Sequence, residues 1–262
     1  MAEPQNPYAT PGSRVADLSA SGPAQPQLIR DGRTVPAGNG WAWLVSGWDL
    51  FKRNPGVWIL IIIIFVAIQM VFSALPLVGM VASYILTPLL VGGIMSGCAA
   101  LERGEALEVA HLFAGFRERT GSLVQVGLLY FAGVVAIGLL LGVFFGFGLV
   151  AGALTGRPPV AEMATLGLVF LLFFALVVPL LMAIWFAPAL VMLHDLKPVD
   201  ALKASFTGCL KNIPAFLIYG IVGLVLAIVA TIPLVLGWLI LGPVAIASAY
   251  TGYRDIFTEP TA

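Results

Sequence analysis

Six apolar stretches, separated by charged or proline-containing segments, constrain the fold of this chain more than any other feature. They cover residues 57–75, 77–98, 123–154, 163–193, 214–231 and 234–250. About 20 apolar residues in a helix cross the hydrocarbon core of a bilayer. The pattern therefore predicts an all-α, polytopic membrane helix bundle of about six transmembrane helices in three hairpins. The third and fourth stretches exceed one crossing, which leaves open whether they are single, kinked or broken helices, with Pro179 and Pro188 as expected kink points in the fourth.

The composition agrees with a lipid environment, because 60% of the 262 residues are hydrophobic and 10% are charged. Soluble domains carry about 25% charged residues, so this chain has too little polar surface to cover a water-soluble globule. A net charge of zero argues against nucleic acid as a partner. We expect residues 1–40, rich in Pro, Gly and Ala, to form a disordered cytoplasmic tail. Residues 41–257 then form the transmembrane domain, and residues 258–262 form a polar C-terminal tail.

The positive charges are sorted to one side of the predicted spans. With six crossings, twelve of the 13 Lys and Arg residues fall on one face, and Arg157 falls on the other. Loops rich in Lys and Arg stay in the cytoplasm. The pattern thus predicts a multi-pass protein of the bacterial inner membrane, with the N-terminus and the C-terminus both cytoplasmic.

A short amphipathic segment precedes each predicted helix pair, which indicates a threefold internal repeat. The segments lie near residues 41–53, 109–117 and 199–211. Helices of this kind suit the membrane interface, and Trp41, Trp43 and Trp48 fit an interfacial aromatic belt. Any protein built from hairpins needs prolines and cations at such places, so the pattern does not by itself prove duplication. Six cations at the ends of these segments are candidate contacts with anionic membrane lipids or a partner: Lys52, Arg53, Arg117, Arg119, Lys203 and Lys211.

Glycines spaced by four residues predict close helix packing in the membrane. The candidates are Gly93, Gly97, Gly138, Gly142 and Gly146. We expect these positions to pack against another helix of the same chain. A homo-oligomer interface, or contact with another membrane protein, is the alternative.

The interiors of the predicted spans contain no Asp, Glu, Lys, Arg or His, which argues against a proton pump or a charged relay. Gln69 is the most notable polar residue at mid-depth and is expected to hydrogen-bond a neighbouring helix. His111 and the pair His194-Asp195 lie in polar loops and form at best a weak metal or acid–base motif. The sequence predicts no catalytic residues, no metal site and no cofactor.

Three motifs resemble an uncharacterised proteobacterial family of hypothetical transmembrane proteins. They are HLFAGFR at residues 111–117, WFAPAL at residues 185–190, followed by His194-Asp195, and YRDIF at residues 253–257. The likeness covers about residues 41–257 and implies an inner-membrane location without an activity. The alternation of amphipathic helices and hairpins is also distantly similar to the membrane domain of some glycerophosphodiester phosphodiesterases, although their catalytic domain is absent from this chain.

Two functions are consistent with these features. The first is a structural or accessory membrane protein that touches anionic lipid through its cation-tipped helices. The alternative is a small transporter or permease for an uncharged or amphipathic substrate, because helix-breaking prolines occur in corresponding places. An enzymatic activity is not expected, and the sequence does not specify a substrate, a partner or an oligomeric state.

Overall fold

A computed structural model describes residues 27–155, 159–233 and 236–259, and nearly all of this part is helical. The helices are α1 (Asn39–Arg53), α2 (Pro55–Ser73), α3 (Val78–Glu102), the 3₁₀ helix η1 (Val109–Phe116), α4 (Thr120–Thr155), α5 (Pro159–Trp185), α6 (Ala187–His194), α7 (Pro198–Lys211), α8 (Ile213–Thr231) and α9 (Trp238–Phe257). Five segments are long and apolar enough to cross a membrane, namely α2, α3, α8, residues 120–147 of α4, and α5 together with α6 from Leu166 to His194. The predicted all-α class is confirmed.

The sixth predicted span corresponds to α9, which is not among these five segments. The helix begins at Trp238 and runs on to Phe257, so that Arg254 and Asp255 lie within its last turns. Its side chains Val244, Ala247, Tyr250, Tyr253, Ile256 and Phe257 are buried inside the protein. The count of six spans therefore stays a prediction, because α9 is a core helix with a charged end.

The two long apolar stretches differ from each other. α4 is one continuous helix of 36 residues, about 54 Å in length at 1.5 Å per residue. The fourth stretch is broken at Phe186, between α5 and α6. The break falls just before Pro188, whereas α5 continues through Pro179. Of the two expected kink points, Pro188 is thus at the break.

The broken helix is held by side chains of α7. The Phe186 N–H donates to the hydroxyl of Ser205 at 2.9 Å, and that hydroxyl donates to the Met182 carbonyl oxygen at 2.7 Å. Ser205 is fully buried. Irregular backbone at membrane depth is tolerated where such partners satisfy its polar groups.

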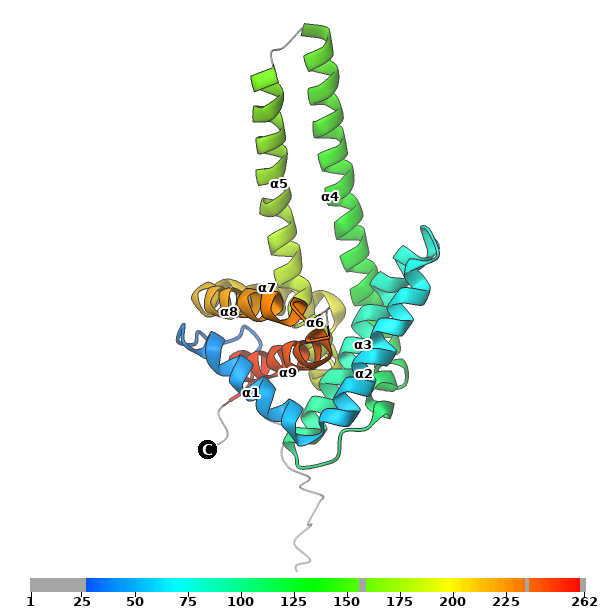
Figure 1. The fold of residues 1–262 in the computed structure, drawn as a ribbon, viewed down its shortest axis with the longest axis vertical. Helices are drawn as coiled ribbons and strands as arrows, with labels where there is room; N and C mark the ends of the chain where they lie inside the picture. Colours follow the sequence, from blue (N-terminus) through cyan, green and yellow to red (C-terminus); the bar gives the residue numbers. More distant parts are fainter. Residues whose placement is uncertain (1–26, 156–158, 234–235, 260–262) are drawn as a thin grey trace, which may run out of the picture.

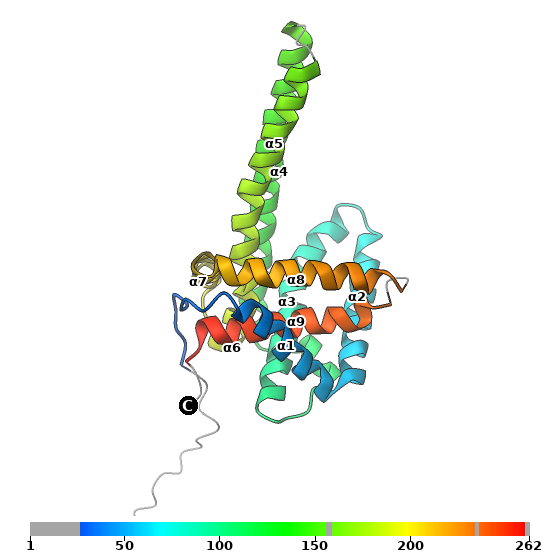
Figure 2. The ribbon, with the colours of Figure 1, turned by 60° about the vertical axis from the view of Figure 1, so that its left-hand side comes forward.

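The short helices pack in a cyclic order. η1 lies against α3, and α7 lies against α5 and α6. α1 lies against α9 and α8, so that the first of these helices packs against the last helix pair (Figures 1 and 2). η1 and α7 therefore each contact the helix pair that precedes them in the chain, and α1 contacts the last pair, α8 and α9. This order is consistent with a threefold repeat, but the duplication itself stays a prediction.

α4 and α5 run side by side and project far beyond the other helices (Figure 1). We call residues 138–150 of α4 and 166–178 of α5 the arm. Many of the described large side chains of the arm are exposed, including Leu139, Phe147 and Leu171. α8 and α9 run across the direction of the arm (Figure 2).

The charged end is the opposite part of the molecule, formed by residues 27–38 and by the C-terminal turns of α1, α3 and α9. Here the predicted boundary of the disordered tail at residue 40 is wrong for residues 27–40, whereas residues 1–26 lie outside the described residues. Leu28 forms an antiparallel bridge with Thr258, and the Arg33 N–H donates to the Ile256 carbonyl oxygen at 2.8 Å. The segment is ordered because the end of α9 offers partners for its backbone, which composition alone does not reveal.

The three tryptophans of α1 do not share one environment, contrary to the predicted interfacial belt. Trp43 is buried in the core, whereas Trp41 and Trp48 are exposed and line an apolar groove against α8 and α9. Gly40, Gly47 and Leu50 lie on the buried face with Trp43. The predicted interfacial belt therefore excludes Trp43.

Candidate functional site

A cavity of about 560 Å³ lies where the helix pairs meet. Its lining comes from α2, α3, α4, α5, α6, α8 and α9. Pro88 and Pro188 both line it, and so does Trp185, which is the last residue of α5 before the break. Ligand pockets commonly have this volume and lie between the helices of a bundle. We call it the central cavity.

A short chain of hydrogen bonds lies on one wall of the central cavity. The Gln69 side-chain amide on α2 donates to the Thr87 hydroxyl on α3 at 3.0 Å, and this hydroxyl donates to the Ser83 carbonyl oxygen at 2.7 Å. The expectation that Gln69 bonds a neighbouring helix is confirmed. Its Oε1 atom is enclosed without a hydrogen-bond partner among the described residues.

Aromatic side chains with polar tips make up another part of the lining: Tyr84, Tyr130, Trp185 and Tyr219. The Tyr84 and Tyr130 rings lie 5.5 Å apart between centroids. The Tyr219 hydroxyl is hydrogen-bonded to the Ser248 hydroxyl at 2.9 Å. No hydrogen bond joins the Tyr84 hydroxyl, the Tyr130 hydroxyl or the Trp185 indole N–H to the rest of the described chain.

The lining of the central cavity carries no charge, because no Asp, Glu, Lys, Arg or His of the described segments takes part in it. An ion placed there would lose its hydration without a counter-charge, which is costly in such surroundings. The arrangement suits an uncharged molecule with an apolar body.

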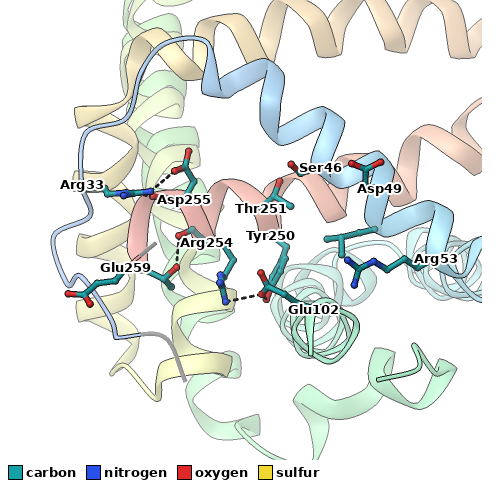
Figure 3. Close-up of a pocket in the computed structure, with 12 residues that line it drawn as sticks. Arg33, Ser46, Asp49, Arg53, Glu102, Tyr250, Thr251, Arg254, Asp255 and Glu259 are labelled. Carbon is teal, nitrogen blue, oxygen red and sulfur yellow. Dashed lines mark hydrogen bonds and ion pairs between the residues drawn. The ribbon is translucent and has the colours of Figure 1, made fainter. Parts of the chain in front are cut away.

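A second pocket, of about 410 Å³, is polar and lies at the charged end (Figure 3). Asp255 is bonded to side chains from two other segments of the chain. Its carboxylate accepts hydrogen bonds from Arg33 at 2.7 Å, from the Asn39 amide at 2.7 Å and from the Trp43 indole at 2.9 Å. These bonds attach residues 27–38 and α1 to the end of α9.

The other wall of this polar pocket joins α9 to α3. The Glu102 carboxylate accepts hydrogen bonds from the Tyr250 hydroxyl at 2.6 Å and from Arg254 at 2.8 Å (Figure 3). The Nε atom of Arg254 is buried and has no partner among the described residues. Arg53 donates to the Leu101 carbonyl oxygen at 2.6 Å. The pocket is thus built from contacts that hold helix ends together.

Two pKa values at the charged end are displaced from their ordinary range. Burial raises the pKa of the Tyr253 phenol, whose hydroxyl is hydrogen-bonded to His194. The hydrogen bond from Arg103 lowers the pKa of the exposed Glu105 carboxyl. Tyr253 is therefore neutral and Glu105 ionised at physiological pH.

The six predicted lipid- or partner-contacting cations have different surroundings. Lys52 forms an exposed pair with Asp49, and Arg119 forms one with Asp195 at 2.6 Å. Lys211 donates to the backbone carbonyl oxygens of Asp31 and Gly32, and Arg53 is occupied by Leu101 as described above. Arg117 and Lys203 are exposed and form no ion pair with another described residue. Their proposed lipid contact stays a prediction.

The predicted glycine contacts divide into two groups. A Cβ atom at Gly93 would lie 2.6 Å from the Leu112 carbonyl oxygen, and one at Gly97 would lie 2.7 Å from a Leu107 methyl group. Both positions therefore face η1 and the residues before it at close range. Gly138, Gly142 and Gly146 instead face open space on the arm, so the expected packing within the chain is wrong for them.

The two histidines have separate partners, since His111 bonds the backbone of Glu108 whereas His194 bonds Tyr253. The described segments contain no group of three or more His, Cys, Asp or Glu side chains placed to hold a metal ion.

The comparisons with known proteins give the location. No family model and no solved structure matches the chain. A protein of Burkholderia thailandensis, named a probable inner membrane protein, is 31% identical over 207 residues, which cover 74% of this chain and 75% of the relative. The chain belongs to this family. It is thus a bacterial inner-membrane protein, and the family name carries no activity; no match supports the likeness to glycerophosphodiester phosphodiesterases.

The cavity residues were mostly missed from sequence. Tyr84, Tyr130 and Tyr219 stand alone in apolar stretches, where an aromatic residue is typical of lipid contact or packing. The hydroxyl groups of these tyrosines were the available indication, but the sequence alone does not show that the three side chains line one cavity.

Proposed function

We propose that this inner-membrane protein is non-enzymatic and binds an uncharged amphipathic molecule in the central cavity, as expected of a small transporter or permease. The central cavity carries this proposal, because it combines an apolar, uncharged lining with a few polar groups. The helix break at Phe186 adds support, since transporters often build substrate sites from discontinuous helices.

The proposed topology has both termini in the cytoplasm. Six spans in three hairpins would require α8 and α9, which run across the arm in this structure, to turn toward its direction (Figure 2). Segments predicted to share that side contact one another, as in the pairs Arg254 with Glu102 and Arg119 with Asp195. Phosphatase fusions after Gly79 and Glu105 test this arrangement. We expect periplasmic activity from the first fusion and none from the second.

A binding measurement tests the ligand class. The purified protein in nanodiscs is titrated with radiolabelled methyl laurate, laurate and dodecyltrimethylammonium, with empty nanodiscs as the blank. We expect saturable binding of the uncharged ester and little binding of the two ions. Equal binding of all three probes, or binding no greater than the blank, contradicts the proposal.

A cavity-filling variant locates the binding. Ala249 lines the central cavity, whereas Ala136 lies on the exposed face of α4. Ala249→Leu is expected to weaken methyl laurate binding about tenfold, and the matched control Ala136→Leu is expected to leave it unchanged.

The second candidate is the accessory role, which the exposed cations Arg117 and Lys203 favour. Binding to anionic-lipid vesicles that falls in the Arg117→Gln, Lys203→Gln double variant would support this role independently of the cavity.

A further inference from the structure

The polar tips in the central cavity specify the ligand further. This step rests on the proposed binding function. Tyr84 on α3, Tyr130 on α4 and Trp185 on α5 line the cavity, and their polar groups form no hydrogen bond with another described residue. In surroundings without bulk water, a polar group without a partner costs free energy.

The indole of Trp185 decides the direction of the missing bond. An indole N–H donates and never accepts, so its partner must carry an acceptor. The phenols of Tyr84 and Tyr130 can donate as well, and their rings lie 5.5 Å apart. The enclosed Gln69 Oε1 lies out of reach of a ligand and does not select for a donor.

The other cavity groups are already occupied. Thr87 is bonded on both sides, by Gln69 and by the Ser83 carbonyl oxygen. The Tyr219 hydroxyl is bonded to Ser248. The donors without partners thus come from α3, α4 and α5. Tyr84 and Tyr130 are neighbours, whereas the Trp185 ring lies beside Tyr219 on α8, 6.1 Å away between centroids.

We infer that the central cavity recognises an uncharged lipid-like molecule through a carbonyl group, as in an ester or a ketone, whose oxygen accepts hydrogen bonds from the neighbouring Tyr84 and Tyr130 phenols, with the Trp185 indole as donor to a second acceptor atom of the molecule. The apolar remainder of the molecule lies against residues such as Val91, Met95 and Ile184. Such a molecule either is a component of the bilayer or reaches the cavity from it.

The test separates the acceptor from the apolar body. The full-length protein is placed in nanodiscs of ether-linked phosphatidylcholine, which has no ester carbonyl, and is titrated with methyl laurate and with tridecane, its carbonyl-free counterpart. We expect methyl laurate to bind at least about tenfold more tightly than tridecane, as two or more hydrogen bonds imply.

Three variants remove one donor each: Tyr84→Phe and Tyr130→Phe, which keep the aromatic ring, and Trp185→Phe, which replaces the indole with a smaller ring. Each is expected to bind methyl laurate about threefold to tenfold more weakly, with tridecane binding unchanged and with the same thermal unfolding in detergent as the unmodified protein. Phe131, which contacts the Tyr84 ring but does not line the cavity, supplies the control Phe131→Leu with unchanged selectivity.

Each outcome has one meaning. Equal affinity for methyl laurate and tridecane, or three variants that retain the selectivity, overturns the carbonyl inference while the binding function stands. Binding of neither probe above empty nanodiscs overturns the binding function itself. Loss of methyl laurate binding when ester-linked phosphatidylcholine replaces the ether lipid supports the inference and identifies bilayer lipid as the source of the carbonyl.

Discussion

Apolar side chains at the charged end of the molecule are buried inside the protein, whereas apolar side chains and glycines along the arm are exposed. Trp43, Tyr253 and Phe257 are buried at the charged end, whereas Leu139 is 67% and Phe147 is 76% exposed. The difference lies in their neighbours, because several helix ends converge on one region and the arm has only its own two helices.

Hydrophobic residues therefore have two structural roles in this chain. At the charged end it drives burial inside the protein, against polar groups that have partners. On the arm it makes a surface that lipid covers. Substitutions of the same type should therefore reduce stability strongly where the protein encloses the residue and little on the arm.

Glycine replacement should show the largest contrast. Gly93→Leu places a side chain against the backbone of η1, so we expect a loss of at least about 3 kcal/mol in stability, or no folded protein. Gly142→Leu on the arm should leave the melting temperature of the monomer unchanged, because a Cβ atom there meets no neighbour. Thermal melts followed by size-exclusion chromatography in detergent measure both, and equal losses would remove the distinction.

Removing the acceptor at the centre of the polar pocket should have the next largest effect. Asp255→Ala leaves the Asn39 amide and the Trp43 indole without their partner and leaves Arg33 only its bond to the backbone carbonyl oxygen of residue 255, so we expect a loss of about 2–3 kcal/mol. The same melts measure the change. An effect below about 0.5 kcal/mol would show that the charged end does not depend on this carboxylate.

Asp49 provides the exposed counterpart. Its pair with Lys52 is about half exposed on both sides, so Asp49→Ala is expected to change stability by less than about 0.5 kcal/mol. A loss as large as that of Asp255→Ala would contradict the ranking of the two carboxylates by burial.

Cysteine labelling sharpens the comparison in native protein. Cys209 is buried on α7, and burial raises its pKa to about 12, from an ordinary value of 9.0. A maleimide should react slowly with it at pH 7 to 9 and quickly after denaturation. A cysteine introduced by Leu139→Cys on the arm, which detergent covers but protein does not, should react faster with a maleimide that partitions into the micelle.

The pH dependence of the stability follows from the raised pKa of Cys209. Because the folded pKa of Cys209 lies above its ordinary value, the contribution to stability is complete below about pH 9 and declines as the pH rises toward 12. Rapid labelling of the native thiol at pH 7 would show that α7 does not enclose it.

Much of the fold followed from periodicity and composition, because the bilayer imposes one requirement on every crossing segment. The apolar stretches at α2, α3, α4 and α8 were located to within a few residues. α9 was described too simply, since the sequence does not show that Tyr250 and Tyr253 are enclosed by other helices. The order of residues 27–38 was missed for the same reason, as it depends on carbonyl groups at the distant end of α9.

The site was less accessible to prediction than the fold. Gln69 was singled out correctly for contact with a neighbouring helix, because an amide in an apolar stretch needs a partner. The tyrosines and Trp185 did not stand out, since no spacing rule unites residues on four separate helices. The glycines of the arm show the converse, where a clear spacing had no partner in this chain.

The cyclic packing of the short helices has a consequence for biogenesis. α1 is synthesised before the other described helices, yet its main partner, α9, is synthesised after all of them. Until α9 has been made, α1 and residues 27–38 lack their native docking surface, and insertion of the intervening helices cannot complete the fold. Premature termination anywhere before α9 would thus expose the beginning of the protein as well as truncate its end, which offers quality-control proteases a signal at the N-terminus.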